Sequence, residues 1–454
     1  MAIFIPFNQD VDPIFPSSVD DWLPEGHLAR YIVQVVKTLD LSEIEGAYSK
    51  GGSAAYPPVM MISLLIYAYA TGVFSTRQIE RATYESAAFR YLAGNHHPDH
   101  DTLAAFRRRF GEQFKALFVQ VLQIAQVNKI SQFGTVSLDG TKVHANASRH
   151  SALSYDHASK IEAQLTQEVK ELLELAKIAN KDNIPEGLII PAEITRREEQ
   201  IEAIKIAKTK IEDRAKERYQ IEKAEFDAKI KERAEKEEKR GRKLGGSKPT
   251  PPVETPLPHD QINLTDEESR IMKTPNGFEQ SYNAQAAVDV DSMLIVAINV
   301  TQAVNDKQQI EPMLKEFQIL SKDIATPTTL LGDTGFFSEN NVNACIEAGV
   351  EPLIASGREG HHPHWKERFS EPEPLPEGAT PVEKMKHKLK TQAGKKIYAK
   401  RKHTVEPVFG IIKSVMGFRQ FMLRGLENAK NEWTLVCLAW NLKRMAILRP
   451  NLAE

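Results

Sequence analysis

The sequence is poor in cysteine: Cys345 and Cys437 are the only two among 454 residues. Two cysteines cannot build a disulfide framework, and they exclude a zinc site made mainly of thiolates.

Hydrophobic runs are also short. A membrane-spanning helix needs about 20 apolar residues, whereas the longest stretches, such as 59–70, are shorter or too polar. Residues 1–16 are too short and too interrupted by Pro and Asp for a signal peptide. We therefore expect a soluble, cytoplasmic protein with no membrane partner.

A strong excess of one charge is missing as well. The net charge is −2 and the isoelectric point is near 6.7, so the bulk composition does not indicate a nucleic-acid partner. Positive charge is instead local: residues 381–403 hold nine Lys or Arg and a single acid, Glu383. Such a run can bind phosphates and release counterions. The length and a hydrophobic fraction of 41% fit roughly two or three folded domains.

What the sequence does contain begins with helices. Residues 57–72 start at a Pro pair and stop at a Gly, as helices commonly do. Ser75 is placed to cap a short helix over 76–86, and Asp101 to cap a longer one over 102–126. We predict that residues 1–130 form an all-helical DNA-binding domain, although the same pattern suits any helical bundle.

Strands and helices then alternate, which favours an α/β fold with a mixed sheet flanked by helices. The predicted strands cover 135–140, two segments of 281–301 joined by a turn at 289–292, 328–333 and 351–356; the predicted helices cover 306–320 and 339–348. We assign residues 131–157 and 258–454 to this domain.

A helical insertion interrupts the strands. Residues 192–240 contain no Gly or Pro, and 161–179 place apolar residues on one face. The segment 180–191 separates these two runs, and a Pro-rich linker follows at 248–260. We predict that residues 158–257 form an inserted helical hairpin with its linker.

Three acids stand out by position. Asp139 follows the strand-like run TVSL, Asp333 follows TTLLG, and Glu406 lies early in a predicted helix. Acids at the carboxyl ends of strands line a crevice in an α/β sheet, and Mg²⁺ prefers oxygen ligands. Two such ions can activate the attacking oxygen and stabilise the leaving oxygen in phosphodiester chemistry.

Several ordered blocks resemble bacterial insertion-sequence transposases of the Asp-Asp-Glu (DDE) class, in particular the type numbered eleven eighty-two within the group related to insertion sequences four and five. They are SLDGTKVHANAS (137–148), EQSYNAQAAVD (279–289), VTQAVNDKQQIEPML (300–314), LLGDTGFFSENN (330–341) and the segment 401–445. The resemblance implies a ribonuclease-H-like catalytic fold. It also implies that Asp139, Asp333 and Glu406 form a catalytic triad that binds two Mg²⁺ ions, for which Mn²⁺ can substitute.

The resemblance further implies double-stranded DNA as partner, both as terminal inverted repeats and as target, and association with the bacterial nucleoid. Because two DNA ends must meet, we expect a homodimer on DNA.

The group carries a Tyr-Arg-Glu-Lys signature, and this chain departs from it: Lys402 occupies the arginine position, with Arg401 beside it, and Tyr398 is one residue too far from Glu406. The candidate DNA-binding residues are Lys142, Arg107, Arg108, Arg401, Lys402 and Lys413.

Simpler interpretations exist for these features. Asp139 and Asp333 each precede or neighbour Gly, as turn aspartates do, and Glu406 suits the first turn of any helix. Arg107 and Arg108 could be a solvated helix face. At the level of the whole chain, the alternatives are a metal-dependent nuclease without strand transfer, a non-catalytic DNA-binding protein derived from a transposase, and a coiled-coil scaffold.

Overall fold

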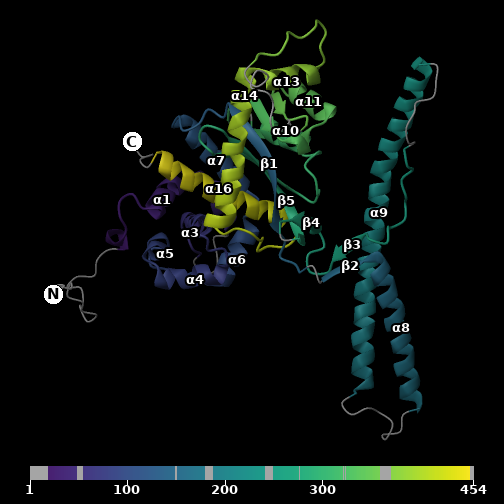
Figure 1. Cartoon of the computed structure of the whole chain (residues 1–454). Helices are drawn as coiled ribbons and strands as arrows, with labels where there is room; N and C mark the ends of the chain where they lie inside the picture. The colour runs from purple at the N-terminus through teal and green to yellow at the C-terminus, as the bar shows by residue number, and fades with distance from the viewer. Residues whose placement is uncertain are drawn as a thin grey trace, which may run out of the picture. The chain divides into compact units, whose positions relative to one another are not determined.

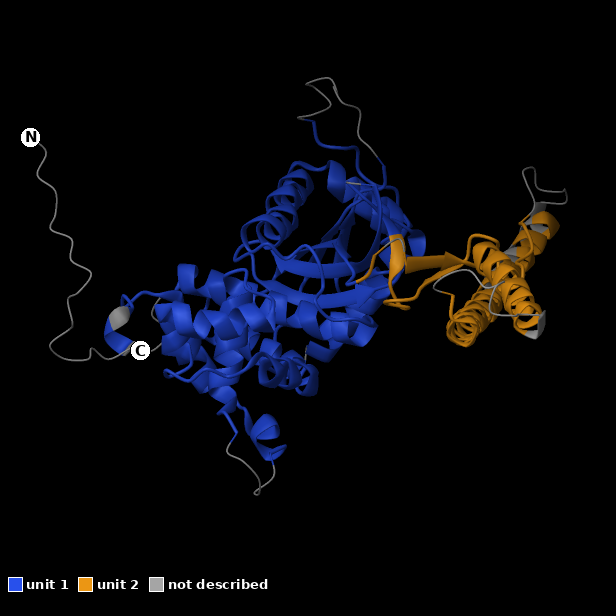
Figure 2. Ribbon diagram, turned by 90° about the horizontal axis from the view of Figure 1, so that it is seen from below, with its two compact units in different colours: residues 1–146, 272–454 blue, residues 147–271 orange. Residues whose placement is uncertain are grey.

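A computed structural model describes residues 19–48, 55–148, 151–178, 188–240, 249–275, 277–320, 322, 324–357 and 370–449. The described residues form two compact units (Figure 2): unit 1 comprises 1–146 and 272–454, and unit 2 comprises 147–271. The predicted boundary at 130 does not separate compact units, because the amino-terminal helices belong to unit 1 together with the sheet. The predicted limits of the insertion, 158–257, lie inside unit 2. Residues 1–16 lie outside the described part of the chain.

The amino-terminal part of unit 1 is helical, as predicted. Its helices are α1 (Leu28–Thr38), α2 (Ser42–Gly46), α3 (Pro58–Ala70), α4 (Thr76–Glu85), α5 (Ala87–Leu92), α6 (His100–Arg109) and α7 (Gln113–Val127). The most apolar of them, α3, is buried along nearly its whole length and packs against α1 and α16 (Leu426–Leu448). Ser75 occupies the N-cap position of α4 without a side-chain capping bond.

The single helix predicted over 102–126 is wrong in two respects. The chain forms two helices, α6 and α7, which are separated around Phe110 and Gly111. A side chain at Gly111 would lie 2.7 Å from the Asn431 amide of α16, so glycine allows the close approach of these helices. The N-cap of α6 is Asp99 and not Asp101, since the Asp99 carboxylate accepts the backbone N–H of Thr102.

A six-stranded mixed sheet forms the centre of unit 1 and confirms the predicted α/β architecture (Figure 1). Its strand order is β4-β5-β1-β7-β8, and β6 also pairs with β5. The strands are β1 (Thr135–His144), β4 (Arg270–Thr274), β5 (Gly277–Asp289), β6 (Ile295–Thr301), β7 (Thr329–Gly332) and β8 (Glu351–Ile354). Strands β1 and β5 are antiparallel, whereas β1, β7 and β8 are parallel.

Helices flank this sheet. Helix α16 packs against β6, α3 and α7, and its buried tryptophans donate hydrogen bonds to the sheet and its turn: Trp433 to the Gln285 carbonyl at 3.1 Å and Trp440 to the Met293 carbonyl at 2.9 Å. Helices α10 (Ile310–Leu320) and α11 (Glu339–Glu347) pack against each other and against β6 and β8 respectively. The segment before α16 contains α13 (Pro381–Lys390), α14 (Gln392–Ala399), a 3-10 turn (Lys400–His403), α15 (Val405–Gly410) and a π-helical turn (Ile411–Val415).

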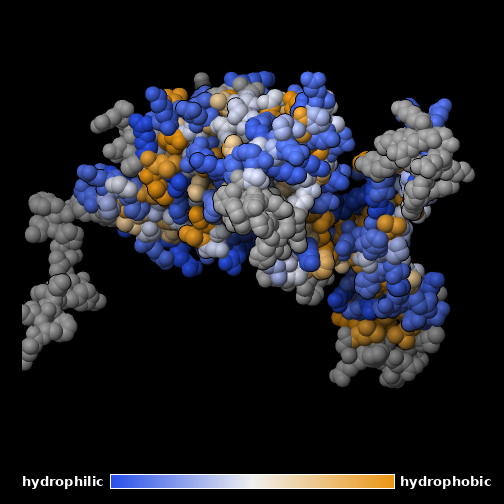
Figure 3. Space-filling model, turned by 45° about the horizontal axis from the view of Figure 1, so that its top comes forward, coloured by the Kyte–Doolittle hydropathy of each residue, from blue (hydrophilic) through white to orange (hydrophobic). Residues whose placement is uncertain are grey.

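Unit 2 contains the predicted helical hairpin, α8 (Tyr155–Ile178) and α9 (Ile190–Arg240), with a small sheet of β2 (Ala152–Ser154) and β3 (Gln261–Asn263). The predicted break between the helices lies largely outside the described residues. The two helices and β3 share an apolar core that includes Ile204, Ile211 and Ile262. Hydrophilic side chains cover most of the remaining hairpin surface (Figure 3).

Within the ranges that the structure describes, no helix is both long and apolar enough to cross a bilayer.

Candidate active site

Asp139 lies on β1, just beyond the point where the pairing of β1 with β7 ends. The predicted strand 135–140 is longer than expected, because pairing with β5 continues to His144. On the other side, pairing with β7 stops at Ser137 opposite Leu331. Asp139 is therefore inside a strand, and not at its end as predicted, but it stands just beyond the last β7 contact. The backbone N–H of Gly140 donates to its Oδ1 at 2.8 Å.

Asp333 directly follows β7, as predicted. Its Oδ1 accepts the backbone N–H of Gly335 at 2.8 Å and caps the 3-10 turn Thr334–Phe336. Since β1 and β7 are parallel neighbours, both aspartates emerge at the same edge of the sheet. This topology brings together two residues that are far apart in the sequence.

Glu406 comes from a third element. It lies in the first turn of α15, and its side chain is 55% exposed. The preceding 3-10 turn carries Arg401, and Tyr398 before it donates a hydrogen bond to the Gly332 carbonyl at 3.1 Å. That bond attaches the end of α14 to the end of β7, which places the following turn beside the two aspartates.

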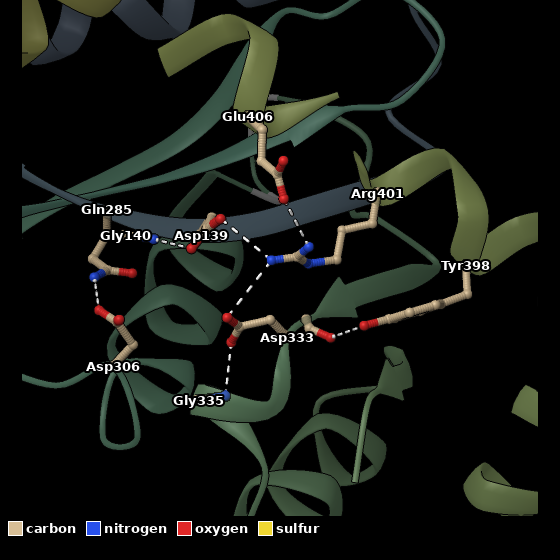
Figure 4. Close-up of polar contacts among 10 residues, drawn as sticks. Asp139, Gly140, Gln285, Asp306, Asp333, Gly335, Tyr398, Arg401 and Glu406 are labelled. Carbon is tan, nitrogen blue, oxygen red and sulfur yellow. Dashed lines mark hydrogen bonds and ion pairs between the residues drawn. The ribbon is translucent and has the colours of Figure 1, made fainter. Parts of the chain in front are cut away.

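The three acids converge on one guanidinium (Figure 4). Nη2 of Arg401 is 3.4 Å from Asp139 Oδ2 and 3.7 Å from Asp333 Oδ2, and Nη1 is 3.2 Å from Glu406 Oε1. Arg401 is only 8% exposed. In this arrangement the charge of Arg401 faces the three carboxylates and not the solvent, and its contact with DNA stays a prediction.

Burial changes the acidity of Asp139. Desolvation raises the pKa of this carboxyl to about 6, and the nearby Asp333 and Asp306 carboxylates raise it as well. The Arg401 charge and the Gly140 N–H oppose that rise in the pKa. The ionised form of Asp139 thus depends on cationic partners in the pocket.

Two lysines border the carboxylates. Lys142, on β1, is mostly buried, with its Nζ 3.8 Å from Asp306 Oδ1. Lys413, in the π-helical turn, donates to the Lys142 carbonyl at 2.7 Å. Burial first, and the charge of Lys142 second, lower the pKa of Lys413 to about 8. Lys402 is exposed and does not join this cluster.

The two arginines of α6 have opposite surroundings. Arg108 is exposed. Arg107 is 7% exposed, donates to the Tyr69 hydroxyl at 2.7 Å, and lies 3.8 Å from the fully buried Glu432 carboxylate. Its role as a DNA ligand stays a prediction; in this structure its guanidinium is used inside the helical core.

Three polar residues of this region were not among the predicted site residues. Asn283 and Gln285, both fully buried on β5, donate to the Asp306 carboxylate. The signal in the sequence is weak: the two amides alternate with alanines in the second half of β5. Asp306 lies in the loop after β6, whereas the sequence predicted it as the first residue of a helix that in fact begins at Ile310.

The donor atoms suit a divalent cation chemically, because all three acids offer oxygens and Mg²⁺ prefers them. The carboxylates already face a shared positive charge, that of Arg401. As the side chains lie, no group of three His, Cys, Asp or Glu in the described ranges is arranged to hold an ion. The guanidinium stands among the carboxylates (Figure 4), so an ion would compete with Arg401 for the same oxygens.

Two family models match the chain. One, described as Transposase domain (DUF772), matches residues 17–109, and the other, described as Transposase DDE domain, matches residues 251–442. The second match contains Asp333 and Glu406, whereas Asp139 precedes it. The search of curated proteins and the search of solved structures found no match.

The mixed sheet, the gathered acids and these two domains define an enzyme, a transposase of the DDE type. The chain carries two transposase domains, and a transposase of this type implies DNA as the substrate. The predicted class of enzyme is thereby confirmed, while the narrower type numbered eleven eighty-two stays a prediction.

Proposed function

We propose that this transposase cuts DNA at the terminal inverted repeats of a mobile element and joins the cut ends to target DNA. In this proposal Asp139, Asp333 and Glu406 are the catalytic triad, on a sheet of ribonuclease-H-like topology. The observation that carries it is the convergence of three acids, from β1, from the end of β7 and from α15, on one guanidinium.

The chemistry follows from the donors. Two divalent ions bound by the triad would activate the attacking oxygen and stabilise the leaving oxygen of an in-line displacement. The attacking group is water for cleavage and a DNA 3′-hydroxyl for strand joining. Tyr398 holds the Arg401 turn against β7, and the Gly140 and Gly335 N–H groups orient the two aspartates.

The surrounding charges fit a DNA substrate. Lys142 lies beside the Asp306 carboxylate, Lys413 donates to the Lys142 carbonyl, and Lys402 and Arg108 are exposed. We assign these four residues to phosphate contacts, which supply sequence-independent affinity. We further propose that two copies act together, one on each end of the element, and that the amino-terminal helices bind the repeats.

Asp139→Asn tests the triad. The substitution keeps the shape of the side chain and removes the charge of a metal ligand, so we expect cleavage of an element-end duplex in Mg²⁺ to fall by several orders of magnitude. The matched control is Asp213→Asn, an aspartate on α9 whose side chain is 61% exposed. Circular dichroism and thermal melts should show both variants folded. Cleavage at the wild-type rate by Asp139→Asn would disprove the triad assignment.

Strand joining needs a separate assay. A duplex whose end is already cut is mixed with target DNA and Mg²⁺, and joined products are counted. A nuclease without strand transfer would cleave the uncut duplex and yield no joined product.

A further inference from the structure

Asp306 is a fourth carboxylate beside the triad. It lies in the loop between β6 and α10, and its side chain is 24% exposed. Three donors converge on its Oδ1: the Gln285 amide at 2.6 Å, the Asn283 amide at 2.7 Å and the Lys142 ammonium at 3.8 Å. Its place in the loop is therefore fixed by β5, a central strand, and it in turn contacts the lysine two residues after Gly140.

Burial of the Asn283 and Gln285 side-chain amides inside the sheet costs free energy of desolvation. Asn283 and Gln285 have no solvent exposure, and their neighbours Ala284, Ala286 and Ala287 are small and apolar. Their nitrogens are turned towards Asp306, and Asn283 also donates to the Ala303 carbonyl. Among the described residues, Asn283 Oδ1 and Gln285 Oε1 are buried without a hydrogen-bond partner. Burying these amides away from solvent is offset by the hydrogen bonds that their nitrogens donate to Asp306.

The side chains of Gln285 and Asp306 also lie close to the backbone of Gly140, which orients Asp139. A Cβ atom on Gly140 would lie 2.2 Å from the Gln285 amide nitrogen and 2.5 Å from Asp306 Oδ1. Only glycine fits there, and its N–H donates to Asp139 Oδ1. Figure 4 shows the Gln285 side chain beside Asp139, with its nitrogen turned to Asp306. Asp306 therefore affects both the orientation of the Asp139 carboxylate and the position of the Lys142 ammonium.

We propose that Asp306 is a positioning residue for the transposase reaction: anchored by Asn283 and Gln285, it holds the Lys142 ammonium where it meets a phosphate of the DNA strand that the triad attacks. This inference rests on the proposed function. Asp306 itself is not a catalytic residue, since it acts through Lys142. Its negative charge lowers total affinity for DNA, so its benefit must lie in placement and not in binding strength.

The test is a double-mutant cycle on Asp306→Asn and Lys142→Ala. Asp306→Asn should slow cleavage of an element-end duplex in Mg²⁺ by about 10- to 100-fold, as misplacement of a reacting group does. It should bind the same duplex at least as tightly as the wild type, because a negative charge is lost. Lys142→Ala should lose both rate and affinity. The double variant should cleave at the rate of Lys142→Ala alone, because the two residues act as one unit.

The control variant is Glu316→Gln on α10, which also neutralises an acid paired with a lysine, Lys115 at 2.9 Å, and it should cleave as the wild type does. Gln285→Met removes one anchor at nearly constant volume and should slow cleavage in the same direction as Asp306→Asn. Thermal melts accompany each variant. Additive losses of rate in the double variant, or a rate loss that follows the melting temperature across variants, would overturn the inference. If the wild type itself fails to cleave, the proposed function fails instead.

Discussion

At the scale of single residues, Lys413 has a property that a surface lysine lacks. Burial and the nearby Lys142 charge lower its pKa to about 8, so its ammonium loses a proton in the alkaline range where exposed lysines remain charged. A bound phosphate favours the charged form and raises the pKa again. Binding of DNA above pH 8 therefore requires uptake of a proton.

This linkage predicts the sign of a pH effect. The affinity of the wild type for duplex DNA should be constant below about pH 8 and should fall above it, by at most about tenfold per pH unit for one proton. Lys413→Arg stays charged throughout, so its affinity should be flat between pH 7.5 and 9.5. Fluorescence anisotropy at fixed salt measures both. An equal dependence of DNA affinity on pH in the two proteins would show that Lys413 does not contact DNA.

The sequence indicated some site residues better than others. Asp139, Asp333 and Glu406 were chosen because each stands at a recognisable position in a strand or helix pattern, and the structure brings them to one pocket. Arg401 was assigned to DNA, because a sequence shows its charge and not its partners. Asp306 could not be identified, because a sequence does not show that Asn283 and Gln285, on the strand that pairs with β1, donate to it.

At the scale of elements, a buried polar chain connects three helices of unit 1. Glu432 of α16 accepts from the Tyr69 hydroxyl of α3 at 2.6 Å, and Arg107 of α6 donates to the same hydroxyl. The second Glu432 oxygen accepts the backbone N–H groups of Met422 and Leu423. Burial raises the pKa of Glu432, and the Arg107 charge opposes this.

Arg107→Met tests that chain. Removing one partner leaves a buried carboxylate uncompensated, which costs about 3–5 kcal/mol. A carboxyl with a raised pKa can take up a proton in acid, so the loss of stability should be larger at pH 8 than at pH 5. The control is Arg108→Met on the same helix, exposed and expected within about 0.5 kcal/mol of the wild type. Urea denaturation followed by tryptophan fluorescence at both pH values measures the difference. A loss that is equal at both pH values would show that Glu432 does not titrate.

Element boundaries show where sequence patterns stop being informative. Five strands of the central sheet were predicted, because periodicity and turn residues are local properties, whereas the short strands β2, β3 and β4 were not. The length of β1 was not, since its extension to His144 depends on pairing with β5. The division of α6 from α7 was not predicted either, because apolar spacing continues across Gly111 while the approach of α16 decides the break.

At the scale of the whole molecule, unit 2 has a core of its own. Ile211 of α9 is 2% exposed in that core, whereas Ile206 on the same helix is 48% exposed. Ile211→Ala should therefore destabilise unit 2 by about 2–5 kcal/mol, and Ile206→Ala should have little effect. Differential scanning calorimetry should show one transition shifted by Ile211→Ala and another unchanged. A common shift of the entire unfolding profile would show that the two units unfold as one.

The separate core of residues 147–271 has an evolutionary consequence. Selection acts on this insertion and on the sheet through different sets of contacts, so substitutions that reshape the hairpin leave the carboxylate pocket undisturbed. We therefore expect that changes in the length of the hairpin leave the chemistry encoded on either side of it intact.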